Sequence, residues 1–238
     1  MEQARELTSP VVGDPSPYSA ERVEQANRRA EAVVLQVDGT VSSVDGLAWL
    51  TSRRGTEMGH RLDALRREAA EQGWSWAELT RARLKHLRPR RAEINQLGAA
   101  YLAGLTPGAA DAVSALRRAG ISIALASDVA AEGLFGVATA LGVSPDELQA
   151  PRLRFDAIGA YVGCDLGAAR DDEASNALGD RASGAPHTLY VGTRRSEVFA
   201  PHGADAFVAF TGVVAQEGRV DPGATVASFH DLATLVLR

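Results

Sequence analysis

The chain has 238 residues, of which 45% are hydrophobic and 23% are charged, and its formal net charge is −5. This composition is typical of a folded chain with a substantial apolar core and excludes a disordered one. Acidic and basic residues alternate along the sequence, so no nucleic-acid partner is indicated, and the single Cys164 rules out an intramolecular disulfide or a cysteine metal cluster.

The first 30 residues are expected to form an N-terminal extension that ends in a polar surface helix from Ser19 to Ala30. This extension contains prolines and acids but no apolar signal core. No stretch elsewhere approaches ~18 consecutive apolar residues. We therefore expect a cytoplasmic protein with no membrane partner.

Residues 32 to 36, AVVLQ, form an apolar run typical of a strand buried on both faces. From 44 to 104 the apolar residues recur at helical spacing, which predicts a small helical insert. This pattern comprises Met58, Leu62, Leu65, Trp76, Leu79, Leu84, Ile94, Leu97 and Leu102. Residues 106 to 120, TPGAADAVSALRRAG, then predict a helix with a threonine cap, proline at its first position and a terminal glycine.

Further strands are predicted at 121–127, 187–192 and 204–210, with a helix at 130–141 and a closing helix in SFHDLATLVLR. This alternation predicts an α/β fold with a doubly wound parallel sheet. Ligands of such folds bind at the carboxyl ends of the strands, so functional residues are expected just after Leu35, Ala126 and Val191.

Four stretches resemble the haloacid dehalogenase superfamily, in particular its phosphoserine phosphatase branch. They are LQVDGTV at the first strand, LTPGAADAVSALRRAGISIALAS ending in Ser127, APRLRFDAIGAYVG, and YVGTRRSEVFAPHGADAFVAF. The resemblance covers residues 31 to 238 and implies an α/β core at 31–43 and 105–238, with a helical cap at 44–104.

The resemblance also implies a chemistry. In this family a first aspartate attacks the phosphate, a second aspartate acts as general acid and base, and a serine or threonine and a lysine hold the phosphate. A magnesium ion is bound by the nucleophile, a backbone carbonyl and an acid of the last motif. These groups are needed because a dianionic phosphate must be surrounded by positive charge and donors before a carboxylate attacks it.

This sequence departs from that pattern at three places. Gly39 and Thr40 fix the register, so Asp38 is the second aspartate and Gln36 takes the nucleophile's place. Thr193 stands where the metal-binding acid of the last motif is expected, which leaves Glu197 as the acid of that loop. The stretch 165–178, DLGAARDDEASNAL, has no lysine; Arg170 is the nearest substitute, whereas the alignment favours Ala174.

The replacement of both expected metal-binding acids bears on the binding of a magnesium ion. Magnesium prefers one or two hard carboxylates, so we expect neither a functional magnesium site nor another cofactor. Asp38 is the candidate catalytic residue, because a desolvated carboxyl beside a neutral glutamine has a pKa suited to proton transfer. The alternative is that Asp38 caps the loop and serves folding.

Eight residues are expected to line the substrate site, and most have a structural alternative. Gln36 contacts either the ligand or the loop backbone, and Asp45 and Asp128 either face the site or cap helices. Arg194 binds an anionic group together with Arg195, or both lie in solvent. The set is Gln36, Thr40, Asp45, Ser127, Asp128, Thr193, Arg194 and Ser196.

Other candidate residues give weaker signals. The five histidines show no metal-ligand spacing, and Ser127 and Cys164 lack a partnered histidine for nucleophilic catalysis. The apolar residues Met58, Trp74 and Trp76 are expected in the core of the cap, with ligand contact as the alternative.

Three functions follow from this sequence. The first is a repurposed, metal-independent enzyme of the lyase, cyclase or isomerase kind, which acts on a small organic molecule, with specialised biosynthesis as a setting. The second is a non-catalytic pseudophosphatase that binds a ligand, and the third is a residual phosphatase. The oligomeric state is left open, a homodimer included.

Overall fold

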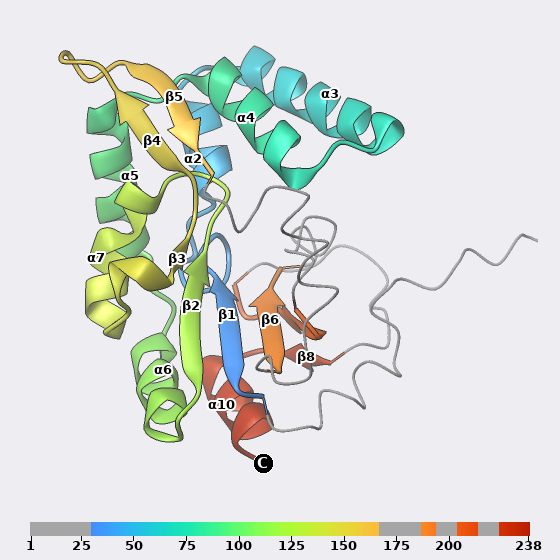
Figure 1. Cartoon of the computed structure of the whole chain (residues 1–238), viewed down its shortest axis with the longest axis vertical. Coiled ribbons are helices and arrows are strands. Elements are labelled where there is room, and N and C mark those ends of the chain that lie inside the picture. The colour runs from blue at the N-terminus through green and yellow to red at the C-terminus, as the bar shows by residue number, and fades with distance from the viewer. Residues whose placement is uncertain (1–29, 167–186, 194–203, 214–223) are drawn as a thin grey trace, which may run out of the picture.

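A computed structural model describes residues 30–166, 187–193, 204–213 and 224–238 of the chain. Its centre is a six-stranded sheet in the order β3-β2-β1-β6-β7-β8, in which every adjacent pair is parallel (Figure 1). The strands are β1 (Ala32–Gln36), β2 (Ser122–Ala126), β3 (Leu148–Gln149), β6 (Thr188–Gly192), β7 (Ala206–Phe210) and β8 (Thr225–Val226). The predicted α/β, doubly wound parallel sheet is confirmed.

The strand order places β1 between β2 and β6, where the winding of the sheet reverses direction. Ligands of doubly wound folds bind in the crevice at this point. The three central strands are apolar and largely buried, because a parallel sheet covered by other layers leaves neither face to water. The residues that follow β1 are therefore held in place at the carboxyl edge of the buried sheet.

Three helices of the core are α6 (Ala109–Arg118), α7 (Ala131–Leu141) and α10 (Phe229–Leu237); α6 and α10 lie at the lower end of the sheet, and α7 lies above α6 (Figure 1). Helix α6 packs along α10. The predicted start of α6 is wrong, because the helix begins at Ala109 after the left-handed N-cap Gly108. The Thr106 hydroxyl instead donates a hydrogen bond to the Thr40 carbonyl at 2.6 Å, which ties this turn to the loop after β1.

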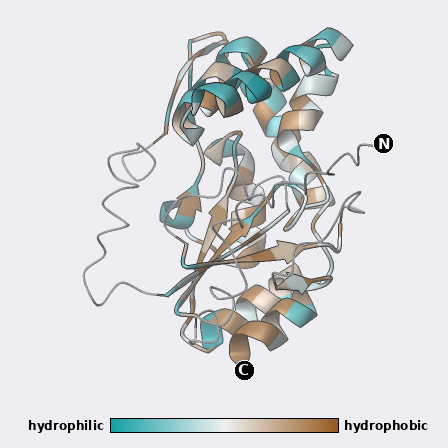
Figure 2. Ribbon diagram, turned by 90° about the vertical axis from the view of Figure 1, so that its right-hand side faces the viewer, coloured by the Kyte–Doolittle hydropathy of each residue, from teal (hydrophilic) through white to brown (hydrophobic). Residues whose placement is uncertain are grey.

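Four helices lie between β1 and α6: α2 (Gly46–Ser52), α3 (Thr56–Gln72), α4 (Trp76–Leu87) and α5 (Arg91–Ala103). Helix α5 packs along α7, and a Cβ added to Gly98 would lie 3.1 Å from the Gly133 carbonyl oxygen. The two glycines allow this close approach. Helices α3 and α4 pack on each other and are largely hydrophilic on the outside (Figure 2).

An antiparallel hairpin of β4 (Arg152–Phe155) and β5 (Tyr161–Asp165) follows a short 3₁₀ turn, η1 (Pro145–Glu147), and β3. It packs against α4 and α7, so it lies at the helical end of the molecule. The sequence pattern did not predict it. The domain boundaries at residues 43 and 104 remain predictions.

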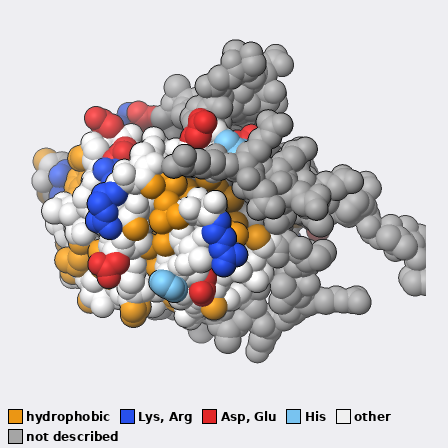
Figure 3. All heavy atoms as spheres, turned by 90° about the horizontal axis from the view of Figure 1, so that it is seen from below, with side chains coloured by type: hydrophobic (Ala, Val, Ile, Leu, Met, Phe, Trp, Pro, Cys, Tyr) orange, Lys and Arg blue, Asp and Glu red, His pale blue; other side chains and the backbone are white. Residues whose placement is uncertain are grey.

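The face of the molecule that contains the lower end of the sheet carries side chains of several chemical kinds. Seen from below, apolar side chains are interrupted by both basic and acidic ones (Figure 3). Among the described helices, none combines the length and hydropathy that crossing a bilayer requires. The N-terminal helix predicted at Ser19 to Ala30 lies outside the described residues, apart from Ala30 itself.

Candidate functional site

The loop after β1 is fixed by its own backbone hydrogen bonds. The amides of Val41 and Ser42 donate to the carbonyls of Gln36 and Val37, and Gly39 takes a left-handed conformation with φ 69°. The Ser42 hydroxyl donates to the Tyr101 carbonyl at 2.9 Å. The loop therefore presents Asp38 in one orientation at the carboxyl edge of the sheet.

Three donors from separate parts of the chain converge on the Asp38 carboxylate. Oδ1 accepts hydrogen bonds from the Gly46 amide at 2.8 Å and the Tyr101 hydroxyl at 2.5 Å, and Oδ2 accepts one from the Ser127 hydroxyl at 2.7 Å. The side chain is 9% exposed. We call Asp38, Tyr101, Ser127 and the Gly46 amide the Asp38 network.

Burial sets the acidity of this carboxyl. Desolvation is the largest effect and, with the nearby Asp45 charge, it raises the pKa of Asp38 from 3.8 to about 6. The hydrogen bonds of the network lower the pKa but do not overcome burial. Burial and the Asp38 charge also raise the pKa of Tyr101 well above 10, so the phenol stays protonated and acts as a donor. Asp38 is thus mostly ionised at pH 7 and takes up its proton about two pH units higher than an exposed aspartate does.

Tyr101 belongs to α5 and was missed in the sequence, where a tyrosine at helical spacing after Ile94 and Leu97 indicates core packing. Its ring is fully buried, as expected of a core residue. Its hydroxyl reaches Asp38 only because α5 lies beside the loop after β1. Spacing along one helix contains no signal for such a contact, since the partners are 63 residues apart.

Gln36 contacts backbone rather than standing free at the strand end. Its side-chain oxygen accepts the Thr193 amide at 2.8 Å, and the Thr193 hydroxyl lies 3.4 Å from the same oxygen. The amide therefore joins the ends of β1 and β6. Of the two roles expected for Gln36, the structure contains the backbone hydrogen bond.

The residues after β2 connect the sheet edge to the helices. Ser127 donates to Asp38, and its oxygen accepts the Val129 amide at 3.2 Å. Asp128 does not cap α7, whose N-cap Ala130 has no side-chain bond; it accepts the Trp76 indole N–H at 2.7 Å. The expectation that Trp76 lies in the cap core is therefore wrong, because its indole nitrogen reaches the strand end.

Asp45 is exposed and Thr40 is buried, and each side chain has a different local environment. Asp45 is the N-cap of α2 and accepts the Ala48 amide at 2.8 Å, while its charge acts on Asp38. Thr40 is fully buried, and its side-chain oxygen has no hydrogen-bond partner among the described residues. Their roles as substrate-binding residues remain predictions.

A second residue missed in the sequence is Arg83 of α4. Its side chain is buried, and burial lowers its pKa, while the charges of Asp128 and Asp45 oppose this effect. The charge of Arg83 therefore lies within electrostatic range of Asp128 and Asp45. In the sequence it was one arginine among many in a helical stretch, and nothing in the pattern distinguished it.

Several candidates lie away from the site or outside the described residues. Trp74 donates its indole N–H to Gln72 at the exposed end of α3, and Met58 packs at the edge of the core. Cys164 lies on β5 near Tyr161, and the pKa of this tyrosine is raised, first by burial and then by its hydrogen bond with the thiol. The predicted Arg194, Arg195, Ser196 and Glu197, and Arg170 and Ala174, lie outside the described residues.

The donors present do not fit a magnesium ion of the kind that the resemblance implies. The position of the first carboxylate is an amide whose oxygen is taken by a backbone N–H, and Thr193 replaces the second acid. Among residues 30–166, 187–193, 204–213 and 224–238, no three His, Cys, Asp or Glu side chains gather as ligands would. Hard cations need such oxygen donors.

No protein-family model and no curated protein matches the sequence. Solved structures do match. A phosphoserine phosphohydrolase-like protein from Francisella tularensis subsp. tularensis SCHU S4 is 16% identical with a TM-score of 0.69, and the match covers 87% of this chain and 99% of that one. The phosphoserine phosphatase from T. onnurineus is 18% identical with a TM-score of 0.60, over 87% and 94%.

A HAD family hydrolase, t0658 from Salmonella enterica subsp. enterica serovar Typhi, is 14% identical with a TM-score of 0.61, over 93% of this chain and 73% of that one. At such identities the likeness concerns the fold. The chain therefore has the fold of the phosphoserine phosphatases and other HAD-like hydrolases, as the sequence motifs predicted.

Proposed function

We propose that this protein is a metal-independent enzyme that moves a proton on a small organic molecule, with Asp38 as the general acid and base. The observation that carries the proposal is the Asp38 network. A buried carboxyl with a pKa of about 6 exchanges its proton readily near neutral pH, which is the property that general acid–base catalysis needs.

The neighbours of Asp38 support this role. Tyr101 and Ser127 donate to opposite oxygens, so they hold the carboxyl in one plane and stabilise its ionised form. Because the pKa of Tyr101 lies well above 10, the phenol does not compete for the substrate proton. A lyase, cyclase or isomerase step requires such an oriented carboxyl next to the carbon or heteroatom that exchanges a proton.

The donor set disfavours the aspartyl-phosphate route. Gln36 is an amide, so it forms no phosphoenzyme, and its oxygen is engaged by Thr193. The reaction that we propose for this fold therefore needs neither a metal ion nor a covalent intermediate. A biosynthetic setting is part of this proposal and rests on the same substitutions.

A second candidate, a ligand-binding protein without turnover, is favoured by one observation. Three donors from the chain itself already bind the Asp38 carboxylate, as they would in a purely structural network. In that case the carboxyl orders the loop, and the protein binds a ligand without changing it.

The test is proton exchange in heavy water. Wild type and the Asp38→Asn variant are incubated with a panel of small carbonyl and hydroxy acids, and deuterium incorporation at carbon is measured by mass spectrometry. Incorporation by wild type that the variant lacks supports the enzyme. Binding of a panel compound to both proteins, without incorporation by either, supports the binder.

A phosphatase panel completes the test. Phosphoserine and an aryl phosphate are offered with and without magnesium. Magnesium-dependent hydrolysis that Asp38→Asn abolishes would overturn the proposal and restore phosphate ester hydrolysis as the function. We expect no hydrolysis above background.

A further inference from the structure

The amide side chain of Gln36 has one end that is fixed and one end that is open. Its Oε1 accepts the Thr193 amide at 2.8 Å. A backbone N–H can only donate, so the atom that faces Thr193 is the oxygen, and Nε2 lies on the other branch of the planar amide. Among the described residues no acceptor bonds this nitrogen, and the side chain is only half-buried. Two N–H donors are therefore available to a ligand.

Gln36 lies where a doubly wound fold binds its ligand. It is the last residue of β1, the strand between β2 and β6 at which the winding of the sheet reverses. The bond to Thr193, the first residue after β6, holds the Gln36 side chain at the carboxyl edge of the sheet. Asp38 follows two residues later in the same loop, so both side chains border this edge.

A pair of donors at this position is the opposite of what the phosphatase pattern requires there. That pattern places a carboxylate at the strand end, and a carboxylate carries a negative charge and accepts hydrogen bonds. The NH₂ group of Gln36 carries no charge and donates hydrogen bonds. The group that it fits is an acceptor on the ligand, such as a carbonyl oxygen.

The charges near this edge favour an uncharged acceptor. Asp38 and Asp128 follow β1 and β2, and the charge of Asp45 acts on Asp38. Arg83 of α4 lies within electrostatic range of Asp128 and Asp45. In the part of the site that the structure describes, acids therefore outnumber bases. A phosphate dianion beside them would be repelled, whereas a neutral carbonyl group would not.

We propose that the Gln36 NH₂ group binds the carbonyl oxygen of the ligand, and that the ligand is a ketone or an aldehyde. The binding role follows from the geometry of the Gln36 amide alone. The reaction step that we derive from it rests on the proposed function, because it uses Asp38 as the base.

In this reaction Asp38 takes a proton from the carbon next to the carbonyl group. The electron pair of the broken C–H bond forms a C=C bond, and the π pair of the carbonyl moves onto its oxygen. The Gln36 N–H groups bind the charge that develops there, and the bond to Thr193 keeps the amide plane fixed while it does. Return of a proton to the same carbon regenerates the carbonyl compound, and in heavy water a deuteron returns instead.

Two variants of Gln36 separate the ends of the amide. Gln36→Glu keeps an oxygen for the Thr193 amide but loses the NH₂ donors, whereas Gln36→Met loses both. Gln149→Glu is the matched control, because Gln149 is also the half-buried last residue of a strand in this sheet. It adds the same charge as Gln36→Glu, two strands away from β1. Far-UV circular dichroism and the unfolding midpoint confirm that each variant folds.

Side-chain ¹⁵N–¹H NMR of protein labelled at glutamine observes the donors directly. The NH₂ resonance of Gln36 is the one that is missing from Gln36→Met. We expect cyclohexanone, as the probe, to move this resonance with a saturable dependence on concentration, while the resonance of Gln149 stays in place. Inorganic phosphate at the same concentrations should leave both resonances unchanged.

The exchange assay measures the reaction step. Cyclohexanone joins the panel that is incubated in heavy water, and the rate of deuterium incorporation is followed by mass spectrometry. We expect Gln36→Glu and Gln36→Met to lower this rate about 100-fold or more, as loss of a donor to a developing oxyanion does. Gln149→Glu should match wild type.

The two measurements distinguish failure of this inference from failure of the proposed function. No saturable shift of the Gln36 resonance with cyclohexanone, or an equal shift with phosphate, would overturn the role of Gln36. A saturable shift without deuterium incorporation would support carbonyl binding by Gln36 and overturn the proposed proton transfer. Incorporation that both Gln36 variants retain and Asp38→Asn loses would support the proton transfer and overturn the role of Gln36.

Discussion

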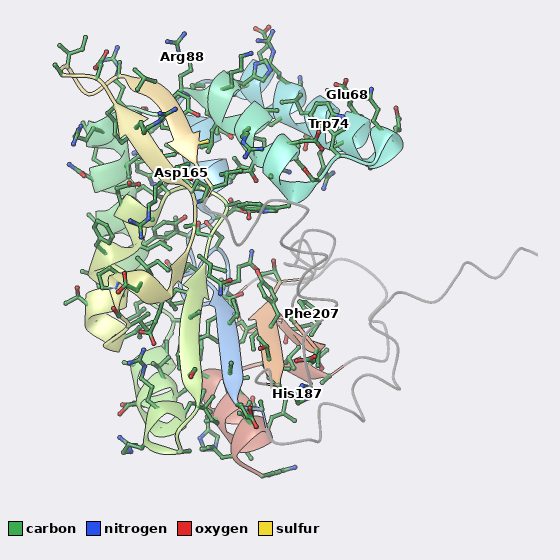
Figure 4. The ribbon with its side chains drawn as sticks, viewed as in Figure 1. Glu68, Trp74, Arg88, Asp165, His187 and Phe207 are labelled. Carbon is green, nitrogen blue, oxygen red and sulfur yellow. The ribbon has the colours of Figure 1, made fainter. Side chains whose placement is uncertain are left out.

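The two ends of the central sheet use the same kinds of side chain in different ways. At the carboxyl end, Asp38 is 9% exposed and three uncharged donors surround it. At the amino end, the Asp205 side chain is 45% exposed; it accepts the Thr188 amide at 2.7 Å and pairs with His187 Nδ1 at 3.1 Å. Figure 4 shows His187 at this end of the sheet, on the α10 side and far from α3 and α4.

Burial explains the difference. Water, the Thr188 amide and the His187 imidazole can stabilise the exposed carboxylate at the amino end, and such exposed pairs contribute about 0–1 kcal/mol. At the carboxyl end the charge is desolvated, and the pKa of Asp38 rises to about 6. The exposed Asp205 carboxylate helps to hold β6 and β7 together. The buried Asp38 carboxylate lowers the stability of the fold, but its raised pKa is the property that proton transfer requires.

The largest effect is expected from Gly46→Ala. A Cβ at this position would lie 1.9 Å from the Tyr101 hydroxyl and 3.0 Å from Asp38 Oδ1, so the network could not form. We expect a loss of more than about 3 kcal/mol in the free energy of unfolding, measured by urea denaturation. Gly59→Ala is the control. Gly59 lies at the end of the first turn of α3, and its Cβ would meet nothing closer than 3.8 Å, so this variant should gain up to about 1 kcal/mol. Similar losses in both variants would contradict this picture.

The second effect is the pH dependence contributed by Asp38. Its folded pKa is raised from 3.8 to about 6, so its contribution to stability is fully present below about pH 4 and is lost as the pH rises to about 6. Because each pH unit between the two values costs about 1.4 kcal/mol, Asp38→Asn should be more stable than wild type by up to about 3 kcal/mol at neutral pH.

Urea denaturation between about pH 4 and pH 7 measures this difference. The advantage of Asp38→Asn should grow over this range and then level off. The exposed α3 carboxylate in Asp63→Asn controls for the change in net charge. A variant that is less stable than wild type at every pH would show that the carboxylate serves folding, as at the amino end.

A smaller effect is expected from Tyr101→Phe. It removes one donor from Asp38 without creating a cavity, so stability should fall by about 1–2 kcal/mol. Loss of a hydrogen bond to the ionised form should also move the pKa of Asp38 above about 6. Carboxyl ¹³C NMR titration measures this pKa, and an unchanged or lower value would contradict the network as drawn.

The smallest effect is expected at the amino end. Asp205→Asn keeps an oxygen for the Thr188 amide and loses only the charge toward His187, so stability should change by about 0.5 kcal/mol or less. The deuterium exchange of the proposed activity should be unchanged. A large loss of either would mean that the two ends of the sheet are coupled.

Local pattern in the sequence was enough to predict four of the six strands of the sheet and the α/β class. Apolar runs at β1, β2, β6 and β7 and the alternation with helices predicted the α/β fold, because strand burial and helical spacing are properties of short segments. The motif from Gln36 to Thr40 placed Asp38 at a strand end. The hairpin β4–β5 and the start of α6 at Ala109 were not predicted, since turn chemistry there depends on tertiary contacts.

Only the tertiary structure decided which side chains meet Asp38. Tyr101 and Ser127 lie 63 and 89 residues away along the chain, and Trp76 reaches Asp128 across 52. The sequence shows a residue's spacing to its neighbours in one helix or strand, but the approach of α5 and α4 to the sheet edge results from packing of whole elements. The pKa of Asp38 is raised by desolvation, and this desolvation results from the packing of several elements around the carboxyl rather than from any single residue.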